Sequence, residues 1–131
     1  MQTTTYGQFF PYIGLMGTTT KTLNTLTLNQ TANSYQFSNA SGAATLSMPT
    51  QTSAPYRVSV AQSVSSSSDL DGSKIPTATT SYQYDAYGNA TQVAVSTPDG
   101  FSKTTANTYT NDTTNWFLGR LTAASVTSVA P

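Results

Sequence analysis

Larger and smaller side chains alternate with a two-residue period over much of this chain, most clearly between residues 79 and 97. Tyr82 and Tyr84 fall on one side of an extended segment, and Val93 and Val95 share a face of the next one. This period is typical of strands with one half-buried face. The pattern predicts two strands joined by a tight turn, and an all-β antiparallel meander of hairpins for the chain as a whole.

The turn between these two strands has a distinctive sequence. Tyr84-Asp85 opens it, and Gly88-Asn89 provides two residues that tolerate the positive φ that a hairpin reversal needs. The Asp85 carboxylate can accept hydrogen bonds from the backbone amides that follow it. We therefore expect these four residues to be structural turn residues.

One further turn is expected on each side of this one. Asp71-Gly72 and Asp99-Gly100 are 28 residues apart, and both are typical turn pairs. This 28-residue interval holds two hairpin arms with the YDxxGN turn between them, which indicates an irregular repeat.

The remaining segments divide one β-sheet region, residues 1–131, into three parts. Residues 1–37 are expected to form the first hairpins, beginning with a strand over residues 2–9 and an aromatic bend over residues 9–14. A second hairpin is predicted with residues 29–33 as its loop. Residues 38–55 are loop-rich, with a short strand near residues 43–48, and residues 56–131 form the main meander. The parts are distinguished by their proline, glycine and small-residue content.

The segment that opens this meander carries three valines and a run of serines. Val58, Val60 and Val64 are expected to line one face of its first strand. The serines at 65–68 are expected to form a flexible hairpin tip.

Composition limits the function classes. Only 37% of residues are hydrophobic and 8% are charged, with a formal net charge of zero, so a thick core would be hard to fill. The five basic residues are isolated from one another, which argues against nucleic acid and against an anionic membrane surface. No apolar run approaches the roughly 20 residues of a membrane helix, and the N-terminal residues lack the pattern of a signal peptide.

Catalytic and metal-binding chemistry is poorly represented. The chain has no cysteine, no histidine and no glutamate, so the common thiol nucleophile, imidazole base and zinc ligands are missing. Most of its five aspartates stand in turn sequences, where a backbone cap is the expected role. Asp69 and Asp71 resemble the start of a calcium loop, but no glutamate follows to complete it. We expect no catalytic residue, no cofactor and no metal.

Aromatic side chains leave two alternatives open. Trp116 and Phe117 can stack on a sugar or a partner protein, or they can cover the sheet as a hydrophobic plug, which we favour. Tyr82, Tyr84 and Tyr87 are expected to form cross-strand ladders rather than a ligand platform.

The residues of the central turn also carry a family resemblance. The segment TTSYQYDAYGN, with the YDxxGN pattern at Tyr84–Asn89, resembles the YD repeat of bacterial Rhs proteins and of the B and C components of Tc insecticidal toxins, which animal teneurins share. The later segment TYTNDTTNWFLGRL and the FFPYIG stretch at Phe9–Gly14 are similar to the SpvB-like subgroup. This resemblance implies hairpins wound side by side into a hollow β-shell that encloses a toxic segment, and a secreted or cell-surface bacterial protein.

One family feature is absent from this chain. In Rhs and Tc C-type proteins, the shell is closed by a self-cleaving aspartyl protease that carries a DPxGxxDP-like sequence motif. No such motif occurs in this sequence. The expected function is therefore that of a structural wall segment without catalysis. Its partners would be the rest of a parent chain, or further copies bound through sheet edges. The alternatives are a stand-alone adhesin or carbohydrate-binding β-domain and, less favoured, a small hydrolase.

Overall fold

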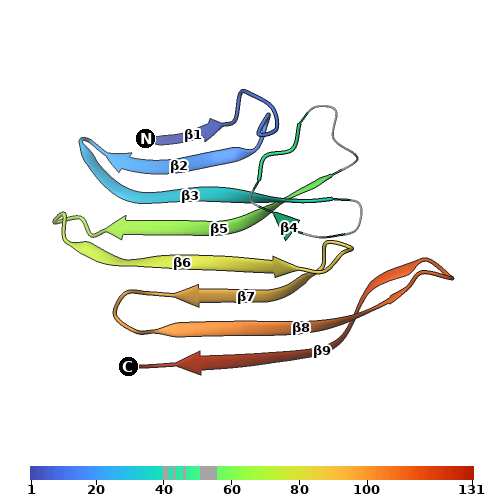
Figure 1. The fold of residues 1–131 in the computed structure, drawn as a ribbon. Helices are drawn as coiled ribbons and strands as arrows, with labels where there is room; N and C mark the ends of the chain where they lie inside the picture. The colour runs from blue at the N-terminus through green and yellow to red at the C-terminus, as the bar shows by residue number, and fades with distance from the viewer. Residues whose placement is uncertain (40–41, 43, 46, 51–55) are drawn as a thin grey trace.

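The computed structural model describes residues 1–39, 42, 44–45, 47–50 and 56–131, which form nine strands (Figure 1). The strands are β1 (Gln2–Tyr6), β2 (Met16–Leu23), β3 (Leu26–Ser38), β4 (Ala44–Thr45), β5 (Arg57–Ser68), β6 (Lys74–Tyr84), β7 (Ala90–Ser96), β8 (Ser102–Asp112) and β9 (Phe117–Val129).

All nine strands belong to one sheet with the order β1-β2-β3-β5-β6-β7-β8-β9, and β4 pairs beside β3. Each strand in this order is antiparallel to its neighbours. The described residues include no helix, and the sheet remains open, with β1 and β9 at its two edges (Figure 1). The prediction of an all-β antiparallel meander is confirmed.

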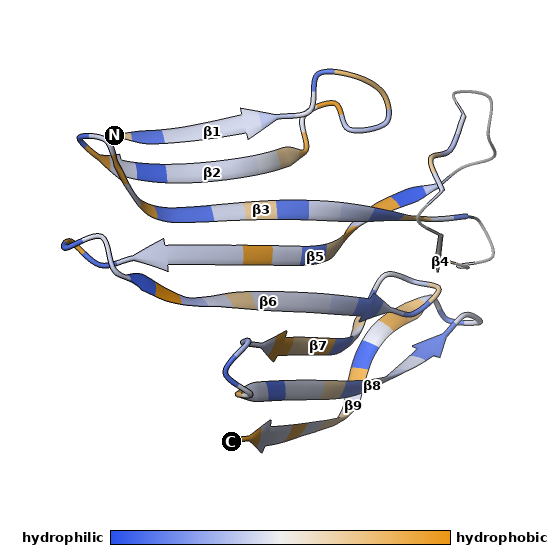
Figure 2. Cartoon of the chain, turned by 60° about the vertical axis from the view of Figure 1, so that its left-hand side comes forward, coloured by the Kyte–Doolittle hydropathy of each residue, from blue (hydrophilic) through white to orange (hydrophobic). Residues whose placement is uncertain are grey.

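The sheet is a single layer with two accessible faces. Among the described residues, Phe37 is the one hydrophobic side chain that is fully buried, at 1% exposure. Hydrophilic and hydrophobic positions are interspersed along the strands, and no second sheet or helix from the described residues covers them (Figure 2). Threonine and serine suit such a sheet because a β-branched or small side chain fits the pleat while its hydroxyl stays hydrated.

Aromatic rings gather near one end of β3, around the buried Phe37. Tyr12 lies with its ring centroid 5.8 Å from that of Phe37, and Phe37 lies 6.2 Å from Tyr56. Phe10 makes an edge contact with Tyr56 at 6.0 Å. The predicted aromatic bend therefore folds onto the sheet through Phe10 and Tyr12, whereas Phe9 is largely exposed.

The predicted second hairpin is wrong. Residues 29–33 are not a loop but the middle of β3, where they pair with β5 residues 63–67. The reversal lies earlier, at Asn24 and Thr25, with Asn24 at φ 53°. Asparagine is among the residues that tolerate this left-handed conformation best. The asparagines of this segment do not break the strand because they find partners on neighbouring strands: Asn29 Nδ2 donates to Ser67 Oγ, and Asn33 Nδ2 donates to the Met16 carbonyl.

The serine run is also part of a strand rather than a flexible tip, because β5 continues through Ser68. The hydroxyls of Ser65, Ser67 and Ser68 have side-chain partners on neighbouring strands. Asn29 Nδ2 donates to Ser67 Oγ at 3.0 Å, and Lys74 Nζ donates to Ser68 Oγ at 3.0 Å. These contacts hold a segment that its composition alone would mark as a loop.

The expectation that three valines share one face of β5 is wrong as well. Val60 lies opposite Tyr35, whereas Val64 lies opposite Ala32, and the register shifts between these pairs. Tyr35 and Ala32 are three residues apart on β3, so they point to opposite faces. Val64 is therefore on the other face from Val60 because a β-bulge inserts one extra residue into β5.

Two other predicted strands are shorter than expected. The first ends at Tyr6 instead of residue 9. The strand expected near residues 43–48 is represented by β4, Ala44–Thr45, while residues 43 and 46 lie outside the described residues.

Candidate functional site

Three of the hairpin turns share one backbone geometry. The first residue of each turn, at position 69, 85 or 97, receives a hydrogen bond at its carbonyl from the amide of the glycine three residues later. Its own amide donates to the carbonyl four residues later. The glycines have φ values of 88°, 92° and 94°, and they are Gly72, Gly88 and Gly100.

This geometry is a type I turn followed by a glycine bulge, one of the common three-residue hairpin loops. It corrects one expectation from the sequence, because Gly88 alone has positive φ in its turn and Asn89 does not. The pairs Asp71-Gly72 and Asp99-Gly100 both occupy the last two loop positions of their turns, after β5 and β7 respectively.

The Asp85 carboxylate has the most extensive hydrogen bonding of the described acids. Its Oδ1 accepts from the amides of Tyr87 and Asn89, both at 2.9 Å. Its Oδ2 accepts from Asn89 Nδ2 at 2.8 Å and from Asn111 Nδ2 at 3.0 Å. One carboxylate thus fixes the turn between β6 and β7 and also connects it to β8.

Arg57, at the start of β5, binds the other side of the same turn. Its guanidinium donates to the carbonyls of Ala86 at 3.0 Å and Asp85 at 3.1 Å. A Cβ atom at Gly88 would lie 3.2 Å from this guanidinium. Gly88 is thus required twice, for its positive φ and for the close approach of Arg57.

The network continues to β9 through Asn111. Its Oδ1 accepts from the Gly119 amide at 2.8 Å and from Asn89 Nδ2 at 3.3 Å. A Cβ atom at Gly119 would lie 2.7 Å from Asn89 Oδ1, so a side chain there would displace the Asn89 amide from this network. We call Arg57, Asp85, Asn89, Asn111 and Gly119 the turn node.

Tyr84, the first residue of the YDxxGN pattern, connects β6 to the neighbouring strand β5. Its hydroxyl donates to the Val60 carbonyl at 3.0 Å, and its ring stacks on Tyr82 with centroids 6.3 Å apart. Burial raises the pKa of the Tyr84 hydroxyl, Tyr82 raises it further, and Arg57 partly opposes both effects. The hydroxyl therefore remains a proton donor at neutral pH.

The electrostatics of the node favour a structural role. Burial around Asp85 raises its pKa, but the hydrogen bonds from Asn89, Asn111 and Tyr87 outweigh this effect and leave the pKa below its ordinary value. A general base needs a free lone pair and a pKa near the operating pH. Asp85 has neither, because its oxygens are taken up by four donors and it stays ionised.

Sequence reasoning found Tyr84, Asp85, Gly88 and Asn89 but missed three members of the node. Arg57 is one of the five isolated basic residues, and Asn111 and Gly119 lie within the segment TYTNDTTNWFLGRL, which stands out in the sequence only for its aromatic residues and its family resemblance. The available signal was weak: a lone arginine, and an asparagine followed eight residues later by glycine.

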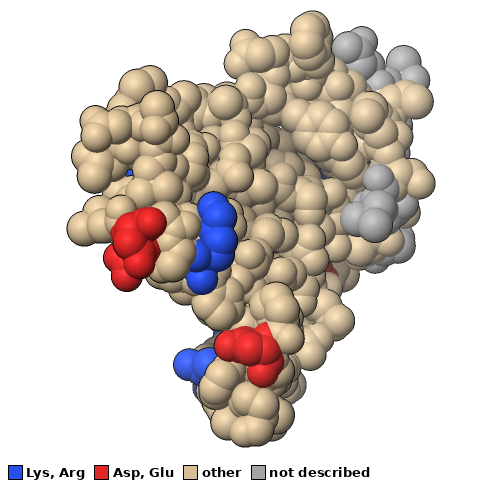
Figure 3. All heavy atoms as spheres, turned by 90° about the vertical axis from the view of Figure 1, so that its left-hand side faces the viewer, with Lys and Arg blue, Asp and Glu red and all other residues tan. Residues whose placement is uncertain are grey.

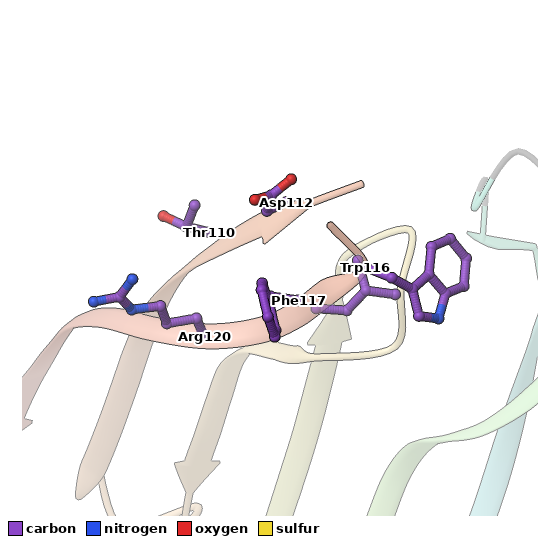
Figure 4. A pocket seen from close by; sticks show the side chains of 6 residues that line it. Thr110, Asp112, Trp116, Phe117 and Arg120 are labelled. Carbon is purple, nitrogen blue, oxygen red and sulfur yellow. The ribbon is translucent and has the colours of Figure 1, made fainter. Parts of the chain in front are cut away.

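Trp116 and Phe117 do not form the predicted plug. They are 73% and 71% exposed at the tip, where the β8–β9 hairpin reverses direction (Figure 4). A hollow of about 600 Å³ lies beside them. Its lining residues are Thr110, Asp112, Trp116, Phe117, Leu118 and Arg120.

Trp116 also has an unusual backbone conformation, with φ 60°. A bulky residue in this region is an outlier whose strain must be compensated elsewhere. The Asp112 carboxylate holds the loop locally by accepting from the amides of Thr114 and Asn115, both at 3.0 Å. Asn115 Nδ2 adds a third bond at 2.8 Å, and these bonds lower the pKa of Asp112.

No cluster of three or more candidate side-chain metal ligands occurs among the described residues. None of the described residues belongs to a helix that could span a membrane.

Comparisons of the chain with protein-family models, with curated proteins and with solved structures gave no match.

Proposed function

We propose that this chain is a structural wall segment of an Rhs- or Tc-toxin-like β-shell, which extends a sheet around a toxic cargo and performs no catalysis. The observation that carries this proposal is the single-layer sheet with two open edges. Such a sheet cannot bury a core of its own, but it can be lengthened strand by strand.

The turn node supports the proposal because it links successive hairpins in series. It joins β5, the β6–β7 turn, β8 and β9 through side chains rather than through a shared core. Five of the side-chain hydrogen bonds among its members involve Asp85 or Asn89 of the YDxxGN pattern. A chain that repeats such a pattern can build a wall of any length, because each hairpin is fixed to the next.

The scarcity of charge also suits stacked strands. Charged side chains are few on the face seen in Figure 3. Like charges placed directly opposite each other destabilise a strand pair. Uncharged threonine and serine ladders avoid this repulsion, and the same property makes nucleic acid and anionic membranes poor partners. The expected partners are the rest of a parent chain or further copies of this one.

Light scattering over a range of protein concentrations tests the wall function. The free chain should self-associate through its edges, and lysines on both edges, in the double variant Thr3→Lys/Val126→Lys, should return it to a monomer with unchanged circular dichroism. A wild-type protein that is folded and monomeric at every concentration would contradict the proposal.

The exposed tip favours a second candidate function, carbohydrate binding. Trp116 and Phe117 offer apolar ring faces beside polar groups, an arrangement that stacks well on sugars. On a glycan array, binding that is lost in Trp116→Ala and kept in Phe101→Ala would support this function. Phe101 is the matched control because it is also exposed but lies at the opposite end of β8. Equal binding by the two variants would exclude the tip as the site.

A further inference from the structure

The two edges of the sheet differ in how well they are protected. β1 has five residues, whereas β9 has thirteen, and every position of β9 from Arg120 to Val129 is exposed. Natural edge strands are protected by charge, proline, bulges or a covering element. Over Ala123–Val129 the sequence AASVTSV carries neither charge nor proline.

The bulges of β9 lie outside this segment. The register with β8 shifts near Leu121 and again between Arg120 and Phe117, but it is regular from Ala123 to Val129. The protective irregularities are therefore confined to the first half of the strand. The second half presents a regular, uncharged strand edge with a free row of backbone donors and acceptors.

We propose that Ala123–Val129 is the docking edge for a second copy of the chain, with β9 antiparallel to β9 of the partner and the two Val126 residues opposite each other. This proposal rests on the proposed wall function and specifies which edge is used. A two-fold axis perpendicular to the sheet relates the copies and continues each face into the same face of the partner.

The side chains across this junction are compatible. Val126 is 58% exposed and ends a ladder in which Tyr82, Val93, Thr105 and Val126 lie opposite one another in turn. Pairing at Val126 extends this ladder with another β-branched residue, the Val126 of the second copy, which makes a favourable cross-strand pair. Arg120 falls beyond the paired segment, so no two cations face each other.

Pairing between β9 and β1 of another copy is less favourable. The main path of the sheet has eight strands in alternating directions, so the two edges would also meet antiparallel. However, β1 can match five residues of β9 at most. The β9–β9 arrangement pairs seven residues and leaves no unmatched regular segment.

Cysteine scanning tests the register, because the chain contains no cysteine of its own. In the proposed register, Val126→Cys alone places two sulfur atoms opposite each other. Under mild oxidation it should form a disulfide-linked dimer at least about fivefold faster than Ala124→Cys or Ser128→Cys, which lie on the same face but are paired with each other. Fastest linkage at 124 or 128 would overturn this register.

Single lysine substitutions test the edge. Val126→Lys would set two ammonium groups opposite each other and should raise the dimer dissociation constant at least about fivefold. The control Thr3→Lys should leave it unchanged. Loss of dimer in Thr3→Lys would overturn the β9 proposal while leaving the wall function intact, whereas a wild-type chain that never associates would overturn both. Circular dichroism of each variant establishes that the sheet is still formed.

Discussion

Asp85 and Asp112 both stand at the start of a hairpin loop and both accept hydrogen bonds from the loop that follows, yet they act over different distances. Asp112 binds Thr114 and Asn115, within its own loop. Asp85 binds its own loop and also Asn111 of β8. The same local motif thus serves one hairpin in the first case and joins neighbouring hairpins in the second.

The difference follows from position in the sheet. The β6–β7 turn lies between Arg57 of β5 and Asn111 of β8, so its polar groups find partners on both sides. The Asp112 loop belongs to the β8–β9 hairpin at the edge of the sheet, and the donors to its carboxylate all come from the same loop. A wall built from repeated hairpins would need contacts of the Asp85 kind at each interior turn.

The largest effect should come from Asp85→Ala, compared with Asp112→Ala. Removing Asp85 leaves four donors without their acceptor, and we expect a loss of about 2 kcal/mol in the free energy of unfolding, within the usual range for unsatisfied polar groups. Asp112→Ala should cost clearly less because water can reach its loop. Urea denaturation measures both, and equal losses would remove the distinction between the two turns.

Gly88→Val should have the next largest effect. A β-branched residue at φ 92° is strained, and its Cβ would also press on the Arg57 guanidinium, so we expect a cost of roughly 1–3 kcal/mol. Gly72→Val is the matched control, since Gly72 has φ 88° but its nearest neighbour would be a leucine methyl at 3.9 Å.

The difference between these two valine variants isolates the contact with Arg57, because the backbone strain is common to both. If Gly88→Val melts at the same temperature as Gly72→Val, the approach of Arg57 contributes nothing to stability. If it melts like the wild type, the turn assignment itself is wrong.

Acidification should lower the stability that the Asp85 and Asp112 loops give to the fold. The loss should be smaller than the loss caused by Asp85→Ala. The hydrogen bonds described above hold the pKa values of Asp85 and Asp112 below their ordinary value of 3.8. A carboxyl whose folded pKa is lowered stabilises the fold above its unfolded pKa, and this contribution disappears as the pH falls through the folded pKa. A protonated carboxyl still accepts some bonds, so the loss is partial.

Thermal melting between about pH 5 and pH 2 measures this dependence. The wild type should lose stability below about pH 3.8, and Asp85→Asn should show a weaker dependence because one of the shifted groups is gone. A wild-type melting temperature that rises on acidification would contradict the sign of these shifts.

Much of the fold could be predicted from the sequence because its signals are local. Alternation at Tyr82 and Tyr84 and the glycine turns are decided within a few residues, and they specify an antiparallel meander. Residues 29–33 and the serines at 65–68 misled the prediction because their strand conformation depends on side chains from neighbouring strands, such as Asn29 with Ser67.

The turn node could be predicted only in part for a similar reason. Asp85 caps its own turn, which the sequence indicates directly. The contacts of Arg57 and Asn111 with this turn depend on which strands become neighbours and on their register. The bulge that separates Val60 from Val64 shows how one inserted residue changes the face of everything beyond it.

The smallest predicted effect concerns the conformation that distinguishes the edge loop from the interior turns. In the β6–β7 turn the left-handed position is glycine, whereas in the β8–β9 loop Trp116 has φ 60°. Replacing Trp116 with glycine removes the steric cost of this conformation, although glycine loses more entropy on folding, so we expect a net gain of about 0.5 kcal/mol. Calorimetry should show a slightly higher melting temperature for Trp116→Gly and a lower one for Trp116→Val, which keeps the strain and removes the ring. A lower melting temperature for the glycine variant would mean that the indole contacts outweigh the strain, and the tip would then be a packed part of the fold instead of a surface left open for a ligand.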